Sequence, residues 1–165
     1  MHNGEVISIN VYLWGSSGEN KILEHDFEAR MGGGLVFRVK YLEMVIWCFS
    51  MNDGTGIVIR DSSKVLVEHN HIKDNNASGI SYLNDSMGEA INNIIEENKR
   101  NGISIRDNAQ VKIERNTIRN NFQSGISYVF YSKGEVIENF IEFNEEYGIE
   151  VRLQGLSEVN LYRNI

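Results

Sequence analysis

The sequence predicts a right-handed parallel β-helix, an all-β solenoid of about seven coils with about 23 residues each. Three observations lead to this fold. Five glycines recur at intervals of 23 residues, asparagines recur at two fixed positions of the same period, and apolar residues alternate along three short runs in each period. A fixed short period of this kind is typical of stacked repeats, in which each coil contacts only its neighbours.

Each of the five glycines begins a short run in which apolar side chains alternate, as in Gly-Ile-Ser-Tyr and Gly-Ile-Ser-Ile. These glycines are Gly56, Gly79, Gly102, Gly125 and Gly148. In the first of these periods, the runs 57–60, 65–68 and 71–73 are predicted strands with one buried face. Three parallel strands in each coil would place equivalent residues of successive coils about 4.8 Å apart.

Two positions of the period hold asparagine in four successive coils. The first position holds Asn70, Asn93, Asn116 and Asn139, and the second holds Asn75, Asn98, Asn121 and Asn144. Asparagine tolerates left-handed turn conformations, and stacked amides donate to and accept from one another along a ladder. These asparagines are therefore predicted to hold the coils together rather than to bind a ligand.

Two outward-facing positions alternate in charge from coil to coil. One position holds Lys73, Glu96, Arg119 and Glu142, and the other holds Glu89, Lys112 and Glu135. Opposite charges on neighbouring strands stabilise a sheet by roughly 0.2–1 kcal/mol for each pair. The two columns are therefore expected to fix the register of the stack without a partner.

A period of 46 residues overlies the period of 23 residues, because residues 56–101 and 102–147 match at 23 of 46 positions. Coils therefore alternate between two types. Tyr82 and Tyr128 mark one type and are expected to point into the core, since Ile59 and Ile105 take their places in the other type.

Residues 1–165 form one expected domain, with less regular coils in 1–55 and regular coils in 56–165. Residues 12–19 and 34–52 resemble later coils, so both are expected to be wound into the stack. The sequence stops inside a coil, which is compatible with a fragment or with a last coil covered by a neighbour or a second copy. Self-association is therefore one expected mode of partner binding.

Composition limits the possible partners. With a formal net charge of −7, the chain is not expected to bind nucleic acid, which requires a basic face. The same charge argues less strongly against an acidic polysaccharide, because one basic face can exist on an acidic protein. Cys48 is the only cysteine, so a disulfide within the chain and a cysteine-based zinc site are excluded.

No apolar stretch is long enough to span a membrane, and no basic segment followed by an apolar run marks a secretory signal. We therefore expect a cytoplasmic protein without membrane contact, or an extracellular one if a signal peptide has been removed.

A metal site is not expected. His69 and His71 flank Asn70 beside Glu68, but the corresponding positions of the next coil hold no histidine. A metal site would need a third ligand and a closed geometry. The two histidines are therefore predicted to be solvated, and no metal or other cofactor is expected.

The pattern Gly-Ile-x-Ile-x-Asp followed by Ile-x-x-Asn-x-Ile-x-x-Asn covers at least residues 56–165. It resembles the parallel β-helix repeats of the pectin-lyase-like superfamily, the carbohydrate-binding and sugar-hydrolase repeats. The alternating coil types, seen in 111–118 and 134–141, look most like the β-helix region of F-box ubiquitin-ligase adaptors and are similar to that of spindle-associated Shc-binding proteins. This resemblance implies an intracellular β-helix that holds protein partners, although neither an F-box nor a zinc-binding accessory box occurs in this sequence.

The resemblance also implies that enzymes on this fold act on polysaccharides with paired carboxylates, or with carboxylate-bound calcium beside a basic residue. The candidates here are Arg60, Asp61, Arg106 and Asp107. The two aspartates would lie roughly 9–10 Å apart, at the edge of the range for an inverting glycosidase and too far for a retaining one. Because both recur with the repeat, turn formation is the favoured interpretation.

Five positions that are polar in the first 46-residue copy are aromatic in the second. The aromatic residues are Phe122, Phe130, Tyr131, Phe143 and Tyr147. Phe122, Phe143 and Tyr147 are expected to cluster at one corner, with the other two at a second corner. Exposed aromatic patches mark contacts with proteins or ligands, so these residues form the predicted partner-binding site. The alternative is that the rings pack on one another as a lid.

The sequence thus favours a non-catalytic β-helix scaffold that mediates protein interaction or assembly. The alternative is a carbohydrate-binding or polysaccharide-modifying β-helix of the lyase, hydrolase or epimerase type.

Overall fold

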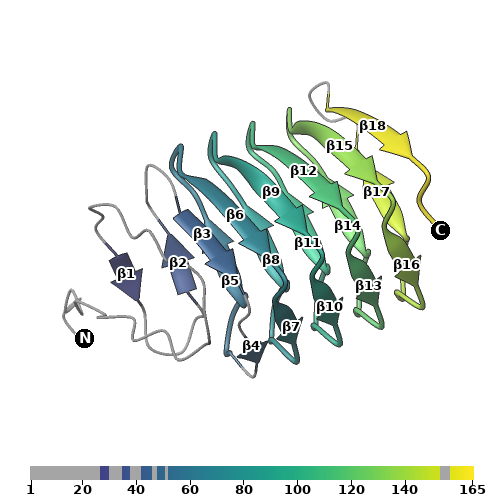
Figure 1. Cartoon of the computed structure of the whole chain (residues 1–165), viewed down its shortest axis with the longest axis horizontal. Coiled ribbons are helices and arrows are strands. Elements are labelled where there is room, and N and C mark those ends of the chain that lie inside the picture. Colours follow the sequence, from purple (N-terminus) through teal and green to yellow (C-terminus); the bar gives the residue numbers. More distant parts are fainter. Residues whose placement is uncertain (1–26, 30–34, 38–41, 46–47, 51, 153–156) are drawn as a thin grey trace.

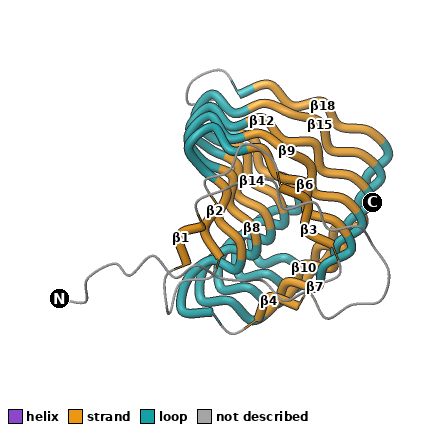
Figure 2. Tube along the Cα trace, turned by 60° about the vertical axis from the view of Figure 1, so that its left-hand side comes forward, coloured by secondary structure: helices purple, strands orange, loops and turns teal. Residues whose placement is uncertain are grey.

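The computed structural model describes residues 27–29, 35–37, 42–45, 48–50, 52–152 and 157–165. All described elements are strands, and the chain winds through three sheets that lie along the long axis of the stack (Figures 1 and 2). Each regular coil contributes one strand to each sheet, and strands from successive coils are neighbours. The predicted all-β solenoid is confirmed.

The three sheets are named A, B and C. Sheet A contains β1 (Phe27–Ala29), β2 (Leu35–Phe37), β5 (Ile57–Ile59), β8 (Ile80–Tyr82), β11 (Ile103–Ile105), β14 (Ile126–Tyr128) and β17 (Ile149–Val151). Sheet B contains β3 (Leu42–Val45), β6 (Lys64–Glu68), β9 (Met87–Ile91), β12 (Gln110–Glu114), β15 (Lys133–Ile137) and β18 (Glu158–Tyr162). Sheet C contains β4 (Cys48–Ser50), β7 (His71–Lys73), β10 (Ile94–Glu96), β13 (Thr117–Arg119) and β16 (Phe140–Glu142).

The coil count differs from the expected seven. Four coils, from β5 to β16, have all three strands and their side chains described. They are flanked by β2–β4 on one side and by β17 and β18 on the other. The coil expected around residues 12–19 lies outside the described residues. The pairing of β1 with β2 is antiparallel, unlike the other described pairings, so the regular parallel winding begins at β2.

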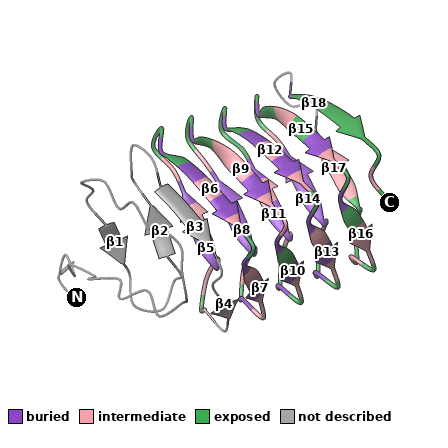
Figure 3. Ribbon diagram, in the orientation of Figure 1, coloured by how far each residue is buried: buried purple, intermediate pink, exposed green. Residues whose placement is uncertain are grey.

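The core fills the space enclosed by the three sheets (Figure 3). On β6, for example, Val65 and Val67 are buried whereas Lys64 is exposed, which is the alternation that a half-buried strand requires. Equivalent apolar residues from successive coils are aligned by the 23-residue register, as in Ile95 opposite Ile118. The strands are therefore joined by one continuous apolar interior.

Both predicted asparagine ladders are present. The backbone N–H and the side-chain amide of Asn93 both donate to Oδ1 of Asn116, each at 2.9 Å. The amide of Asn116 donates in turn to Oδ1 of Asn139 at 2.9 Å and to the backbone carbonyl of Ala90 at 2.8 Å. The second ladder repeats this arrangement from Asn52 through Asn75, Asn98 and Asn121 to Asn144. The side chains thus satisfy buried backbone groups at the turns.

The two coil types differ by an exchange of side-chain size across the core. Tyr82 and Tyr128 are fully buried in sheet A, as predicted. In sheet B the same coils carry Gly88 and Gly134, and both glycines are aligned with Val111. A Cβ atom on Gly134 would clash first with the backbone carbonyl oxygen of Val111, and it would also lie 2.7 Å from the Tyr128 hydroxyl oxygen, so both neighbours require glycine here. That hydroxyl donates to the Val111 carbonyl at 2.8 Å.

The charge columns follow the predicted register but pair differently. Arg119 binds Glu96 through Nε at 2.8 Å, as expected for neighbouring strands. Lys73 is aligned with Glu96 but forms its ion pair with Asp74 at 3.7 Å. Lys112 is aligned with two glutamates of neighbouring coils, yet its amine pairs with Glu114 of its own strand at 2.6 Å. A flexible lysine side chain thus takes the nearest carboxylate, not necessarily the one directly opposite.

Candidate functional site

The outer face of sheet A carries the polar residues that the sequence suggested for carbohydrate chemistry. Its centre is lined by short side chains, since Ser81, Ser104 and Ser127 are aligned on β8, β11 and β14. Ser81 and Ser127 are buried, at 7% and 4% exposure, whereas Ser104 is half-buried. The next outward position, just after each strand, holds Arg60, Leu83, Arg106, Val129 and Arg152. Backbone hydrogen bonds continue through this position, for example from Arg106 N–H to the Tyr82 carbonyl at 3.0 Å.

Three arginines therefore recur on alternate coils along one edge of sheet A. We call Arg60, Arg106 and Arg152 the arginine row. At a strand spacing of about 4.8 Å, neighbouring members are about 9.5 Å apart along the stack. Leu83 and Val129 lie between them, so the edge alternates between charged and apolar side chains.

Each arginine of the row has a carboxylate beside it. Arg60 Nε lies 3.3 Å from Asp61 Oδ2, and Arg106 Nε lies 3.6 Å from Asp107 Oδ2. Arg152 Nε donates to Oε1 of Glu150 at 2.7 Å. The row consequently presents guanidinium donors and carboxylate acceptors side by side, with the charges balanced within each coil.

Glu150 is a member of this site that the sequence analysis missed. It is aligned with Ser127 on the outer face of sheet A and accepts a hydrogen bond from the Ser127 hydroxyl at 2.8 Å. Its carboxylate thus joins a hydroxyl and a guanidinium group into one network. The signal was present in the repeat, because Gly-Ile-Glu-Val replaces the serine that follows Gly-Ile in the three preceding coils.

The structure does not bring Asp61 and Asp107 together. They belong to coils two apart, and each is held beside the arginine of its own coil. Both have positive φ angles, 58° and 57°, at the turn that leads from sheet A to sheet B. Asp61 also accepts a hydrogen bond from the Asn84 amide at 3.3 Å. These contacts fit the turn-forming interpretation and provide no joint acid and base.

The five predicted aromatic residues are all exposed, at two corners of the stack. Phe122 is 45% exposed, Phe143 77% and Tyr147 59%, and all three lie in the turns between sheets C and A. Phe130 and Tyr131 lie in the turn between sheets A and B, and are 43% and 58% exposed. A ring contact with a cation is present at Phe122, where the Lys99 amine lies 4.1 Å from the ring centre.

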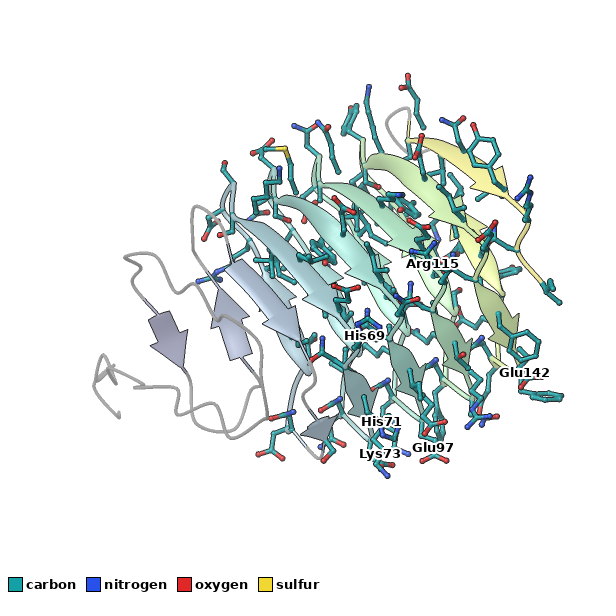
Figure 4. The ribbon with its side chains drawn as sticks, viewed as in Figure 1. His69, His71, Lys73, Glu97, Arg115 and Glu142 are labelled. Carbon is teal, nitrogen blue, oxygen red and sulfur yellow. The ribbon has the colours of Figure 1, made fainter. Side chains whose placement is uncertain are left out.

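The two histidines, labelled in Figure 4, lie beside different carboxylates. His69 Nδ1 lies 3.4 Å from its neighbour Glu68, whereas His71 Nε2 lies 2.8 Å from Glu96 on β10. Partial burial raises the pKa of the Glu96 carboxyl, but hydrogen bonds from Arg119 and His71 outweigh it, so this pKa lies below its ordinary value. Among the residues that the structure describes, no three His, Cys, Asp or Glu side chains are grouped to hold a metal ion.

These three stacked sheets, with their asparagine ladders, define the chain as a β-helix protein. A family model described as a right-handed β-helix region matches residues 9–165, and the chain belongs to this family.

Among solved structures, the chain is similar to a double mutant of the periplasmic alginate epimerase AlgG, with a TM-score of 0.66 and 20% sequence identity. The match covers 75% of this chain and 35% of the epimerase chain, so the present sequence spans about a third of that protein. At this identity the similarity establishes the fold alone. No curated protein matches the sequence. In the described part of the chain, no helix has the length and apolar character needed to cross a membrane.

Proposed function

We propose that this protein binds a polysaccharide along the outer face of sheet A. The observation that carries the proposal is the arginine row, in which three arginine–carboxylate pairs recur on alternate coils. Donors and acceptors repeated at about 9.5 Å suit a ligand that is itself a repeating polymer rich in hydroxyl groups. The structural neighbour, an alginate epimerase, supports polysaccharides as the ligand class.

The charges favour a polymer with few acidic groups. Every arginine of the row already has a carboxylate partner, and the whole chain has a formal net charge of −7. A polyanion would therefore meet a face without excess positive charge, on a protein that repels it at longer range. A neutral chain, in contrast, would bond to both members of each pair through its hydroxyl groups.

The test is a binding measurement by calorimetry with galactomannan, xylan and a soluble β-glucan, with alginate and polygalacturonate as acidic comparisons. Arg106→Gln combined with Asp107→Asn should weaken binding of the neutral chains at least about tenfold, since it removes a central charge pair from the face. Asparagine is suited to position 107 because Asn84 has the same backbone conformation one coil earlier.

The matched control is Lys112→Gln with Glu114→Gln, which removes an ion pair of 2.6 Å from the outer face of sheet B together with the second contact of Glu114, to Arg115. It should bind as the unmodified protein does. Equal affinity of the sheet A variant would contradict the proposal, as would the absence of binding to every polymer. Release of reducing ends or of unsaturated products from a bound polymer would extend the proposal from binding to modification.

Protein interaction is the second candidate function. It is favoured by Phe122, Phe143 and Tyr147, which are exposed at the same corner of the stack. If the protein binds no polysaccharide but forms a defined complex that is lost when these three residues are changed to serine, this function replaces the first.

A further inference from the structure

The turn between sheets A and B has the same backbone conformation in four successive coils but different side chains in the last one. Its first position holds Asp61, Asn84, Asp107 and Phe130, and its second holds Ser62, Asp85, Asn108 and Tyr131. All eight residues have φ angles between 51° and 67°. We call Phe130 and Tyr131 the turn pair.

An aromatic residue is unusual in this conformation. The left-handed region is populated mainly by glycine, asparagine and aspartate, and is disfavoured for bulky side chains. The backbone of the turn is nevertheless maintained, since Asn108 N–H donates to the Phe130 carbonyl at 3.0 Å. The turn pair is thus held in place by the stack rather than by its own conformational preference.

The aromatic side chains also end a ladder of polar contacts. In the preceding coils the Asn84 amide donates to Asp61, and the Asn108 amide donates to Asp85. Phe130 has no polar side-chain atom, and Tyr131 has only a hydroxyl at the far end of its ring, so neither has a side-chain amide to continue these hydrogen bonds. Packing offers limited compensation, because the two side chains remain 43% and 58% exposed. The stability of the turn therefore does not explain why aromatic residues occupy these two positions. Residues that lower the stability of a fold are candidates for a role in function.

The position of the turn pair connects it with the arginine row. Phe130 occupies the column in which Asp61 and Asp107 lie beside the row arginines of their own coils. Its coil comes directly between the coil of Arg106 and that of Arg152. A polymer that extends along the row and bonds to both of these arginines would pass the turn pair, about 4.8 Å from each coil.

We propose that the turn pair is an aromatic platform on which one sugar ring of a bound neutral polysaccharide packs, so that it fixes the position of the chain along the arginine row. The C–H groups on one face of a pyranose ring pack flat against an aromatic ring, while the hydroxyl groups at its rim bond to the charged pairs on either side. This inference rests on the proposed polysaccharide binding.

The sequence itself supplies the test variant. Phe130→Asn with Tyr131→Asp restores the residues found at Asn84 and Asp85 two coils earlier. Asparagine and aspartate adopt the left-handed backbone conformation of this turn more readily than aromatic residues do. The melting temperature of the variant should therefore stay the same or rise by about a few degrees. Affinity for galactomannan, xylan or β-glucan, whichever binds the unmodified protein most tightly, should fall at least about tenfold.

Two further variants separate the platform from other effects. Phe122→Asn restores the Asn76 of two coils earlier and removes an exposed ring at the other corner, so it should leave the affinity unchanged. Phe130→Tyr keeps a ring in the turn and should retain most of the affinity. A loss of affinity in the Phe130 and Tyr131 variant alone, without loss of stability, supports the inference.

The contrary outcomes are distinguishable. If the variant of the turn pair binds the polymer as tightly as the unmodified protein does, while the Arg106 and Asp107 variant binds it more weakly, the inferred role of the turn pair is wrong and the proposed function stands. If the turn-pair variant is less stable and binds normally, the aromatic pair has a structural role and the inference fails. If the unmodified protein binds none of the neutral polymers, the proposed function and this inference fail together.

Discussion

A buried tyrosine and a glycine on the next sheet form one packing unit in this protein. Tyr128 fills space that Gly134 leaves open, and the Tyr128 hydroxyl is satisfied by the Val111 carbonyl at 2.8 Å. Burial raises the pKa of this hydroxyl far above its ordinary value, so it stays protonated as a hydrogen-bond donor. In the coil before it, Ile105 and Val111 fill the same volume without a polar group.

We therefore expect Tyr128 and Gly134 to be energetically coupled. Gly134→Val should destabilise the fold by about 1–3 kcal/mol or more, because its Cβ would clash with the Val111 carbonyl and with the Tyr128 hydroxyl. Tyr128→Ile should cost about 2–4 kcal/mol by leaving a cavity, and it removes the second of these clashes. The double variant copies Ile105 and Val111, so it should be less destabilised than the sum of the single changes by about 1–3 kcal/mol. Urea denaturation of the four proteins measures this difference; strict additivity would contradict the packing unit.

At the scale of the strands and turns, the 23-residue register follows from the sequence because each repeated residue has a distinct structural requirement. The ladder asparagines and the inward isoleucines recur without a gap from 56 to 147, so their alignment is determined by spacing alone. The ion-pair partners of the charged side chains cannot be predicted from the sequence in the same way, since Lys112 pairs with Glu114 of its own strand and not with a glutamate of a neighbouring coil. Long side chains choose among several carboxylates within reach, and spacing does not decide between them.

The candidate site was predicted only in part for a similar reason. Arg60 and Arg106 were recognised from their recurrence, whereas Glu150 was missed because it occurs once, at the end of a column of serines. Its network with Ser127 and Arg152 depends on side-chain positions. The alternation of Tyr82 and Tyr128 was visible in the sequence, but its cause, the glycine on the adjacent sheet, required the arrangement of the coils in space.

The ion pair between Glu96 and Arg119, on neighbouring strands of sheet C, should make stability depend on pH. The pKa of Glu96 is lower in the folded protein than in the unfolded chain, so its contribution is fully present above the unfolded pKa of about 4.3 and is lost as the pH falls through the folded value. Arg119→Glu places a negative charge between Glu96 and Glu142, and should cost about 1 kcal/mol at pH 7.

The measurement is urea denaturation at neutral pH and at about pH 3, where carboxylates become protonated. The stability difference between the unmodified protein and Arg119→Glu should shrink at the lower pH. Arg119→Gln removes the pair without adding a charge, so its cost at neutral pH should be the smaller of the two. An Arg119→Glu effect that does not change with pH would show that the pair is not the source of the difference.

For the molecule as a whole, stability depends on which types of coil are stacked on each other as well as on each coil by itself. In the four fully described coils, coils of the tyrosine type alternate with coils of the isoleucine type. The charge in the column that contains Glu96 changes sign from each coil to the next in the same way. Stability in such a stack is close to a sum of coil terms and nearest-neighbour terms. The stack should therefore tolerate changes in length only when these neighbour relations are preserved.

Two insertion variants would test whether the neighbour relations between coils determine stability. A second copy of residues 56–101 placed after residue 101 adds two coils and keeps every neighbour relation between the two types, so the melting temperature should be equal or higher. A second copy of residues 79–101 adds one coil, but it stacks Tyr82 on a second Tyr82 and Glu96 on a second Glu96. This shorter insertion should lower the melting temperature, and a rise equal to that of the longer one would contradict the expectation.

The pairing of a large tyrosine with a glycine on the adjacent sheet thus affects how the number of repeats can evolve, as well as how the core packs. If genes of this kind gain or lose repeats by recombination, a change by an even number of coils should keep the alternation of the two coil types. A change by an odd number should place two coils of the same type next to each other. Natural variation in length is then expected in steps of 46 residues. Each step would lengthen the arginine row by one member, so that inheritance in pairs of coils also sets the increments in which the reach of the polymer-binding face can evolve.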